Sequence, residues 1–214
     1  PVNDAPVIIS PVDDMVLKED QELVNIDLDL VFDDIEGSDL TYSFQVVDTD
    51  IFELELNVSN LSIAPSQDQS GNPVTVLIQA NDEDGRAVSE DSFDIEVLPV
   101  NDPPAFSLSN ESINVNEDFQ ELHTISVAPD AIPLDEVSQS VMYSLSPLPE
   151  DVTLISIDID PNTGTISFSS NQDEFGEQEF LVLAQDDGGT ENGGVNTFDT
   201  TFTIFVAPVN DPPT

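Results

Sequence analysis

One tetrapeptide recurs along the chain and divides it into similar parts. The motif Pro-Val-Asn-Asp begins at three positions, Pro1, Pro99 and Pro208. Between successive copies the same landmarks follow in the same order: a Glu-Asp pair, a tyrosine within an alternating segment, and a strand end that reads Ala-x-Asp. Landmarks that repeat in order are typical of tandem copies of one structural unit. We therefore predict two domains, residues 1–99 and residues 100–214, the second with a C-terminal linker.

Each unit has the sequence pattern of β-strands. Apolar and polar residues alternate with a period of two in Leu40–Phe44, Phe52–Leu56, Phe93–Val97 and Phe202–Val206. This alternation indicates strands with one buried face, and turn residues separate the short runs. No segment sustains the spacing of an amphipathic helix. The prediction is an all-β chain of two tandem Greek-key, immunoglobulin-like β-sandwiches, each of about seven strands.

Charge excludes several classes of function. The 214 residues include 45 Asp and Glu but only 2 Lys and Arg, which gives a formal net charge of −43. Binding to nucleic acid or to an anionic membrane surface needs clustered basic residues, so neither is expected. The chain has no Cys, which excludes disulfides, zinc–thiolate sites and a cysteine nucleophile. No apolar stretch is long enough to predict membrane insertion.

The same charge predicts a cationic ligand. Self-repulsion on this scale destabilises a compact state unless salt or bound cations screen it. The composition nevertheless supplies a core, because 38% of residues are hydrophobic and 12 are Phe. A divalent metal ion is therefore the leading candidate for a cofactor.

The ordered motifs resemble those of a known family. Val-Asn-Asp-Pro-Pro-Ala-Phe at the joint, the early Glu-Asp pair, Asp34-Ile35-Glu36 before the tyrosine strand, and Ala-x-Asp-x-x-Gly follow one another. Together they resemble the cadherin-like repeats of bacterial cell-surface proteins, which are related to animal cadherins and to the cadherin-like domain of dystroglycan. The resemblance covers both units. Animal cadherins carry Asp-x-Asn-Asp-Asn-x-Pro at the joint, so the shorter motif here implies fewer calcium ions per joint.

The resemblance implies calcium ligands at each joint between repeats. At the central joint they are Glu19, Asn101, Asp102, Asp135 and Asp186. At the N-terminal joint, which lacks a preceding repeat, they are Asn3, Asp4, Asp34, Glu36 and Asp82. At the C-terminal joint they are Glu117, Asn210 and Asp211. Unit two has Val137 where unit one has Glu36, so either Glu136 substitutes or one ligand is lost.

The function implied is that of a calcium-rigidified extracellular repeat segment of a membrane-associated bacterial adhesin. It would act as an extender or in cell adhesion, at the cell surface or in a secreted protein. Its expected partners are flanking repeats of the same chain and another cell-surface protein or a polysaccharide. The alternative is a carbohydrate-binding module of a secreted polysaccharide-active protein, although aromatic residues make up only 7% of the chain and most are Phe at inward alternating positions. No pattern of residues predicts an enzyme.

Three smaller features have local interpretations. Asp20 and Asp118 are expected at exposed or turn-forming positions. Asp158–Gly164 resembles a calcium-binding EF-hand loop, but its glycine is misplaced and a hairpin turn is the better interpretation. His123 is expected on the polar face of a strand, without catalytic partners.

Overall fold

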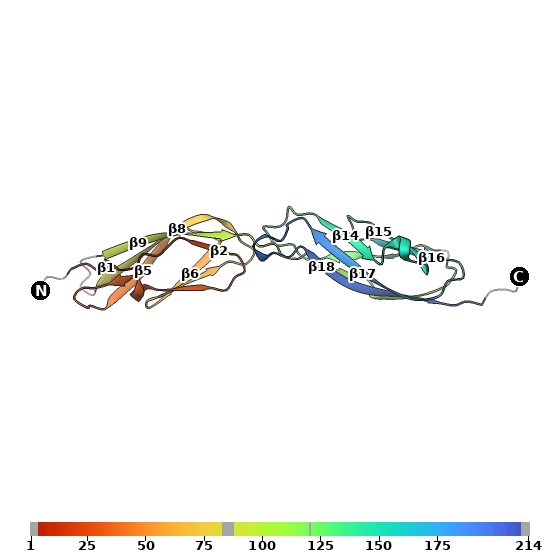
Figure 1. Cartoon of the computed structure of the whole chain (residues 1–214), viewed down its shortest axis with the longest axis horizontal. Helices are drawn as coiled ribbons and strands as arrows, with labels where there is room; N and C mark the ends of the chain where they lie inside the picture. The colour runs from red at the N-terminus through yellow and green to blue at the C-terminus, as the bar shows by residue number, and fades with distance from the viewer. Residues whose placement is uncertain (1–3, 83–87, 120, 211–214) are drawn as a thin grey trace. The chain divides into compact units, whose positions relative to one another are not determined.

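The computed structural model describes residues 4–82, 88–119 and 121–210. The chain divides into two compact units, Pro1–Val100 and Asn101–Thr214. This division lies one residue from the boundary predicted between residues 99 and 100. Figure 1 labels several strands of both units, and each unit is described by itself below.

In unit one, short strands alternate with turns throughout the described residues. The strands are β1 (Val7–Ile8), β2 (Met15–Lys18), β3 (Val24–Asp27), β4 (Phe32–Asp33), β5 (Leu40–Val46), β6 (Phe52–Asn57), β7 (Asn60–Pro65), β8 (Gly71–Asp82) and β9 (Val88–Leu98). One 3-10 turn, η1 (Leu28–Leu30), precedes β4.

Unit two repeats this series. Its strands are β10 (Phe106–Leu108), β11 (Ser112–Asn116), β12 (His123–Ile125), β13 (Val127–Pro129), β14 (Val141–Ser146), β15 (Ile155–Ile159), β16 (Ile166–Ser170), β17 (Gly176–Asp186) and β18 (Thr197–Ala207). Two 3-10 turns, η2 (Pro149–Asp151) and η3 (Glu191–Gly193), lie in its loops.

Both units are sandwiches of the same topology. In unit one the larger sheet has the order β2-β9-β8-β5 and the smaller sheet the order β3-β7-β6, with a separate β1-β4 pair. In unit two the corresponding orders are β11-β18-β17-β14 and β12-β16-β15, with β10-β13 as the pair. Strand β2 runs parallel to β9, and β11 runs parallel to β18. The chain crosses between the two sheets from β2 to β3, from β5 to β6 and from β7 to β8, whereas β6–β7 and β8–β9 are antiparallel neighbours within one sheet. This arrangement confirms the Greek-key sandwich prediction.

Alternating side chains from both sheets fill each core. In unit one Leu61 and Ile63 of β7 pack with Val76, Ile78 and Phe93 of the larger sheet, and all five are almost fully buried. Unit two has an equivalent cluster from β14 to β18. The four predicted alternating segments all lie within strands, namely β5, β6, β9 and β18. Period-two patterning therefore identified the core faces correctly.

The local predictions had mixed outcomes. Asp20 and Asp118 have left-handed backbone φ angles of 59° and 62°, as turn residues do. His123 was placed wrongly on the polar face. Its ring lies 5.3 Å from that of Phe168 and 4.9 Å from that of Phe119, on the same strand face as buried Ile125. The alternation of polar and apolar residues predicted the wrong face for His123, because an imidazole ring can pack against aromatic rings at the edge of a core.

The two units differ at one hairpin. Strands β6 and β7 are joined by Val58 and Ser59, with Val58 at a φ of 57°. The corresponding loop in unit two is longer and runs from Asp160 to Thr165. Asp160 Oδ1 accepts the backbone N–H groups of Asn162 and Thr163, and Gly164 has a φ of 68°, so the predicted hairpin interpretation is confirmed.

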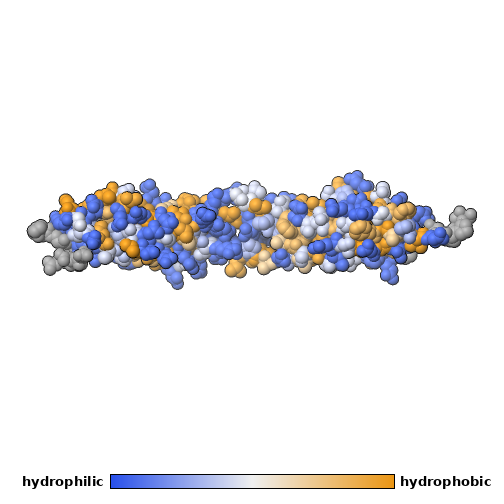
Figure 2. Space-filling view, turned by 90° about the horizontal axis from the view of Figure 1, so that it is seen from below, coloured by the Kyte–Doolittle hydropathy of each residue, from blue (hydrophilic) through white to orange (hydrophobic). Residues whose placement is uncertain are grey.

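Hydrophilic residues cover much of the visible surface. In Figure 2 blue residues occur along both units, with orange apolar residues between them. The exposed apolar side chains include Ile35, Val47 and Val58 in unit one and Leu134 and Val137 in unit two. Scattered exposed apolar residues are ordinary for a soluble surface.

We predict that Phe93→Ala lowers the free energy of unfolding of unit one by about 3–5 kcal/mol, because it removes a fully buried ring. Denaturant titration followed by amide hydrogen exchange checks this, since exchange should quicken in β8 but not in β17. The control Val47→Ala, at a 75% exposed side chain, should change stability by less than about 0.5 kcal/mol. Equal quickening in both units would contradict two separate cores.

Candidate metal centre

Six carboxylic acids are buried in the described parts of the chain. They are Glu19, Asp34, Asp82, Glu117, Glu136 and Asp186, each at most 7% exposed. Aspartate and glutamate are rarely buried unless they are paired. The sequence contains only two basic side chains of the Lys and Arg type. Side-chain cations therefore cannot neutralise this set.

The buried acids recur at equivalent ends of the two units. Asp82 is the last residue of β8, and Asp186 is the last residue of β17. Glu19 follows β2, whose final residue Lys18 is aligned with Leu98 at the far end of β9. Glu19 therefore lies at the opposite end of unit one from Asp82. Glu117 has the same relation to Asp186, because β11 is aligned with the end of β18.

Asn101 is the centre of the hydrogen-bond network at one end of unit two. Its Nδ2 donates to Asp186 Oδ1 at 3.1 Å and to the Val195 carbonyl at 2.7 Å. The backbone carbonyl of Asn101 accepts the Val195 N–H at 2.8 Å. Asn101 Oδ1 and Asp186 Oδ2 are buried and accept no hydrogen bond. Two oxygens with free lone pairs are thus held in a buried polar environment, a costly arrangement without a ligand.

Two glycines allow the loop after β17 to approach Asn101. A Cβ at Gly188 would lie 1.5 Å from Asn101 Oδ1, and a Cβ at Gly194 would lie 2.8 Å from the Asn101 backbone nitrogen. Gly188 N–H also donates to Asp186 Oδ1 at 3.0 Å. Sequence reasoning missed these glycines and the Val195 carbonyl. The Gly-rich run 188–194 was the available signal, since glycine often marks a close backbone approach.

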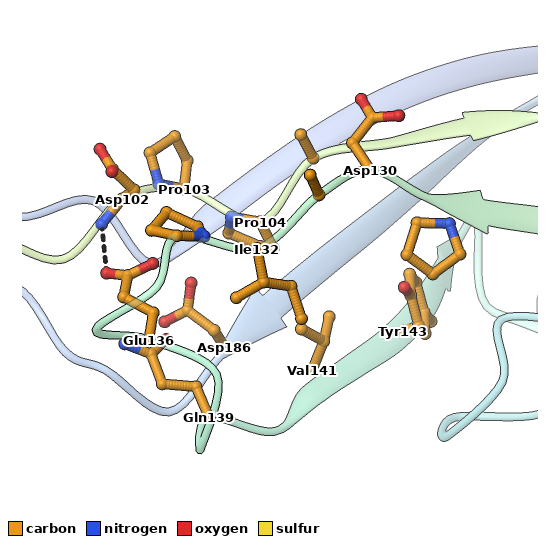
Figure 3. A pocket seen from close by; sticks show the side chains of 14 residues that line it. Asp102, Pro103, Pro104, Asp130, Ile132, Glu136, Gln139, Val141, Tyr143 and Asp186 are labelled. Atoms are coloured by element: carbon orange, nitrogen blue, oxygen red, sulfur yellow. Dashed lines mark hydrogen bonds between the residues drawn. The ribbon is translucent and has the colours of Figure 1, made fainter. Parts of the chain in front are cut away.

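Glu136 lies in the same region of unit two. Its Oε1 accepts the Asp102 N–H at 2.7 Å, and Figure 3 shows Glu136, Asp102 and Asp186 around one pocket. Pro104, Ile132 and Val141 form apolar parts of the pocket lining. Burial raises the pKa of Glu136, and the negative charges of Asp102 and Asp135 raise it further, although the Asp102 N–H opposes the rise. A bound cation would favour the charged form.

Asp135, which the resemblance implied as a ligand, is exposed in the structure. Its neighbour Glu136 is 6% exposed and occupies the interior position instead. Sequence spacing from Tyr143 selected Asp135, but the turn from Pro133 to Gln139 directs the following residue inward. In that turn Glu136 N–H donates to the Pro133 carbonyl, and Gln139 N–H donates to the Glu136 carbonyl.

Unit one has a related but different arrangement at the end that contains Asp82. Asp34 Oδ1 accepts the N–H groups of Glu36 and Ser38, both at 3.0 Å, while Asp34 Oδ2 is buried with no hydrogen-bond partner. Glu36 accepts the Asp4 N–H at 3.4 Å. Asn81 Oδ1 is also buried without a hydrogen bond. The structure therefore brings Asp4, Asp34 and Glu36 into one network, whereas Asn81 belongs to the opposite face of β8 from Asp82, because it is aligned with exposed Thr41.

Glu19 and Glu117 each hold the linker motif of their own unit. Glu19 Oε1 accepts the Val100 N–H, and Glu117 Oε1 accepts the Val209 N–H at 2.6 Å. Their backbone N–H groups donate to Leu98 and Ala207 respectively. Both glutamates thus fix the Val of a Pro-Val-Asn-Asp motif, a structural role that the sequence analysis did not foresee.

Three of the predicted ligand residues lie near the two ends of the chain. Asn3 and Asp211 lie outside the described residues. Asn210 is described and exposed.

Oxygen donors of this kind fit calcium. Ca²⁺ takes 6–8 oxygen ligands from carboxylates, amide and backbone carbonyls and water. Asn101 Oδ1 and Asp186 Oδ2 are such donors, as are Asp34 Oδ2 and Asn81 Oδ1 in unit one. Within either unit taken alone, no three described carboxylates have ligand oxygens within 4.8 Å of one another.

Comparisons with known proteins give structural likenesses without a family assignment. No protein-family model matches the sequence, and no curated protein matches it. Human protocadherin-24 EC1-2 is similar with a TM-score of 0.46 and 20% identity, over 99% of this chain and 100% of that chain. Drosophila N-cadherin EC1-4 has a TM-score of 0.46 and 14% identity, over 97% of this chain and 50% of that chain.

An endo-fucoidan hydrolase of glycoside hydrolase family 107 is also similar, with a TM-score of 0.37 and 16% identity. The match covers 96% of this chain and 29% of that chain. The strand pairing within each unit, described above, defines the fold. Among the described residues, no helix has the length and apolar character needed to span a bilayer.

We predict opposite effects of Glu136→Gln in the absence and presence of calcium. With chelator near neutral pH the variant should melt at a higher temperature, because it removes a buried charge and keeps an acceptor for the Asp102 N–H. A carboxyl group whose pKa is raised in the folded state stabilises the fold at low pH and loses that contribution as the pH rises through the raised pKa. The higher melting temperature of the variant should therefore disappear in acid. With calcium, the variant should bind the ion at least about tenfold more weakly.

Asp135→Asn is the matched control, at the exposed neighbouring position, and should alter neither quantity appreciably. Calorimetric melting and calcium titration measure both effects. Weaker calcium binding in Asp135→Asn than in Glu136→Gln would restore Asp135 as the ligand and contradict this placement.

Proposed function

We propose that this chain is a calcium-binding segment of tandem β-sandwich repeats in an extracellular adhesion protein. The observation that supports it is the pair of buried oxygens, Asn101 Oδ1 and Asp186 Oδ2, that accept no hydrogen bond at the end of a sandwich. The recurrence of buried acids at the equivalent end of unit one supports it further. The repeated linker motif and the cadherin-like order of landmarks provide the adhesion part of the proposal.

In unit two Asn101, Asp102, Glu136 and Asp186 would hold the ion, and in unit one Asp34, Glu36 and Asp82 would do so. A calcium ion supplies positive charge and a flexible oxygen coordination shell, and no catalytic step is proposed. Flexible coordination favours calcium over magnesium, which requires near-ideal octahedral geometry. Extracellular calcium modules bind with Kd values of about 10⁻⁴–10⁻³ M, a range that suits a cell-surface location.

Calcium would also restrain the linker, since Asn101 and Asp102 belong to the Pro-Val-Asn-Asp motif. Pro103 and Pro104 follow directly and already limit backbone freedom. We propose that this restraint lets the segment act as an extender of a bacterial adhesin. Its partners would be flanking repeats and another cell-surface protein or a polysaccharide, with no nucleic acid.

We predict that calcium raises the melting temperature well beyond the effect of sodium chloride at matched ionic strength. Binding to the native state alone adds about 2.7 kcal/mol when the free ion is at 100 times Kd. Calorimetry on the whole chain in chelator, in sodium chloride and in calcium chloride provides the measurement. A melting temperature that follows ionic strength alone would indicate a general salt requirement and overturn the proposal.

A variant pair separates a site from diffuse counterion binding. Asp186→Asn should weaken calcium binding by about tenfold or more, because it removes the charge of a buried ligand. Asp199→Asn removes the same charge from an exposed position of β18 and should leave the titration almost unchanged. Equal losses in the two variants would show that calcium is only a counterion.

A further inference from the structure

The outer edge of β5 in unit one differs from the equivalent edge in unit two. β5 and β14 are the terminal strands of their four-stranded sheets, and each is paired on one side only, with β8 and β17 respectively. The registers are the same, because Tyr42 is aligned with Ala80 and Tyr143 with Ala184. The two edges can therefore be compared residue by residue.

In unit two the long hairpin loop covers the edge. The Tyr143 N–H donates to the Pro161 carbonyl at 2.9 Å, so it points away from β17. A Cβ at Gly164 would lie 3.1 Å from Tyr143 Cγ, which shows how closely the loop approaches the ring. Tyr143 and Leu145 are accordingly only 6% and 4% exposed.

In unit one the hairpin of Val58 and Ser59 is too short to give this cover. Among the described residues, no backbone hydrogen bond outside the β5–β8 ladder reaches β5. Leu40, Tyr42, Phe44 and Val46 face the core, yet all four are only half-buried. From the shared register, the N–H groups of Tyr42 and Phe44 point outward, as that of Tyr143 does.

The usual protections of an edge strand are missing from β5. Such strands are normally blocked by charged side chains, proline, a bulge or a covering loop. Residues 40–46 read Leu-Thr-Tyr-Ser-Phe-Gln-Val, without a charge or a proline. The β5–β8 register is continuous from Leu40 to Val46, with no shift. This edge therefore offers free donors and acceptors to an added strand.

Charge selects the kind of strand that can be added. The Tyr42 hydroxyl donates to Asp29 Oδ1 at 2.7 Å. The uncharged strand thus has a carboxylate beside it. A second copy of this chain would bring a further net charge of −43, whereas a basic segment is attracted.

We propose that the outer edge of β5 binds an extended segment rich in Lys or Arg from another protein, which pairs as an added β-strand. No residue of β5 is among the proposed calcium ligands. The outer edge of β5 would therefore give the segment a binding role in addition to its role as an extender. Main-chain hydrogen bonds to Tyr42 and Phe44 would hold the added strand, and a basic side chain of that strand would lie near Asp29. Unit two would not bind it, because its own loop occupies the edge.

Two peptides of equal charge test the proposal on the whole chain. The first is a capped peptide of about nine residues with alternating Lys and Val, and the second carries N-methyl groups on alternate amides. Nuclear magnetic resonance titration in 150 mM sodium chloride should show binding of the first peptide alone. Exchange of the Tyr42 and Phe44 amide protons should slow by about tenfold or more, while that of Tyr143 stays unchanged.

A matched pair of variants gives a second readout. Ser43→Lys places a positive charge on β5 and should weaken peptide binding by about tenfold, whereas Ser144→Lys, at the equivalent exposed position of β14, should not. If Ser43→Lys fails to fold, the comparison of the two peptides on the unsubstituted chain still tests the proposal. Equal binding of both peptides, no slowed exchange at β5, or self-association through β5 in the peptide-free protein would each overturn the proposal.

Discussion

Burying carboxylates without basic side chains to neutralise them is the constraint on which the rest of this structure depends. Six acids are almost fully enclosed, and the chain has only two Lys and Arg residues. Backbone N–H groups satisfy part of the requirement, as at Asp34, Glu117 and Glu136. Such bonds stabilise a carboxylate but do not cancel its charge. A bound cation, as we propose, would neutralise this charge, which makes the metal proposal an electrostatic one.

The sandwich provides the positions that such a site needs. Strands β8 and β17 end in an aspartate at the same end of each unit, and a turn from the preceding part of the chain brings a second acid to it. Loop lengths then make the copies unequal. Unit one has Asp34 and Glu36 in its turn. Unit two has Glu136 in its turn, and a glycine-rich loop packs closely against Asn101. Two sites of different strength are the expected consequence, because ligand charge tunes calcium affinity.

Sequence patterning was sufficient for the fold because the period-two alternation of segments such as Phe93–Val97 directly reflects which face is buried. Repeat spacing also placed Asp82 and Asp186 at strand ends, where the structure has them buried. It selected Asp135 and gave Glu136 only as a substitute at the position of Val137, because one residue of turn geometry decides which side chain enters the interior. Nor could it show that Asn81 has a buried oxygen without a hydrogen bond, or that Glu19 is bonded to the Val100 N–H. Those facts depend on tertiary contacts between residues distant in sequence.

Following the Asn101 side chain while calcium is added is the most direct test of the central claim. The side-chain amide of Asn101 and the backbone amide of Gly188 can be observed by nuclear magnetic resonance in the whole chain. If Asn101 Oδ1 and Asp186 Oδ2 bind the ion, these two signals should shift and saturate with calcium, and equal ionic strength of sodium chloride should not reproduce the shifts. Unchanged signals at Asn101 and Gly188, with only small gradual shifts spread over exposed acidic residues, would contradict the account.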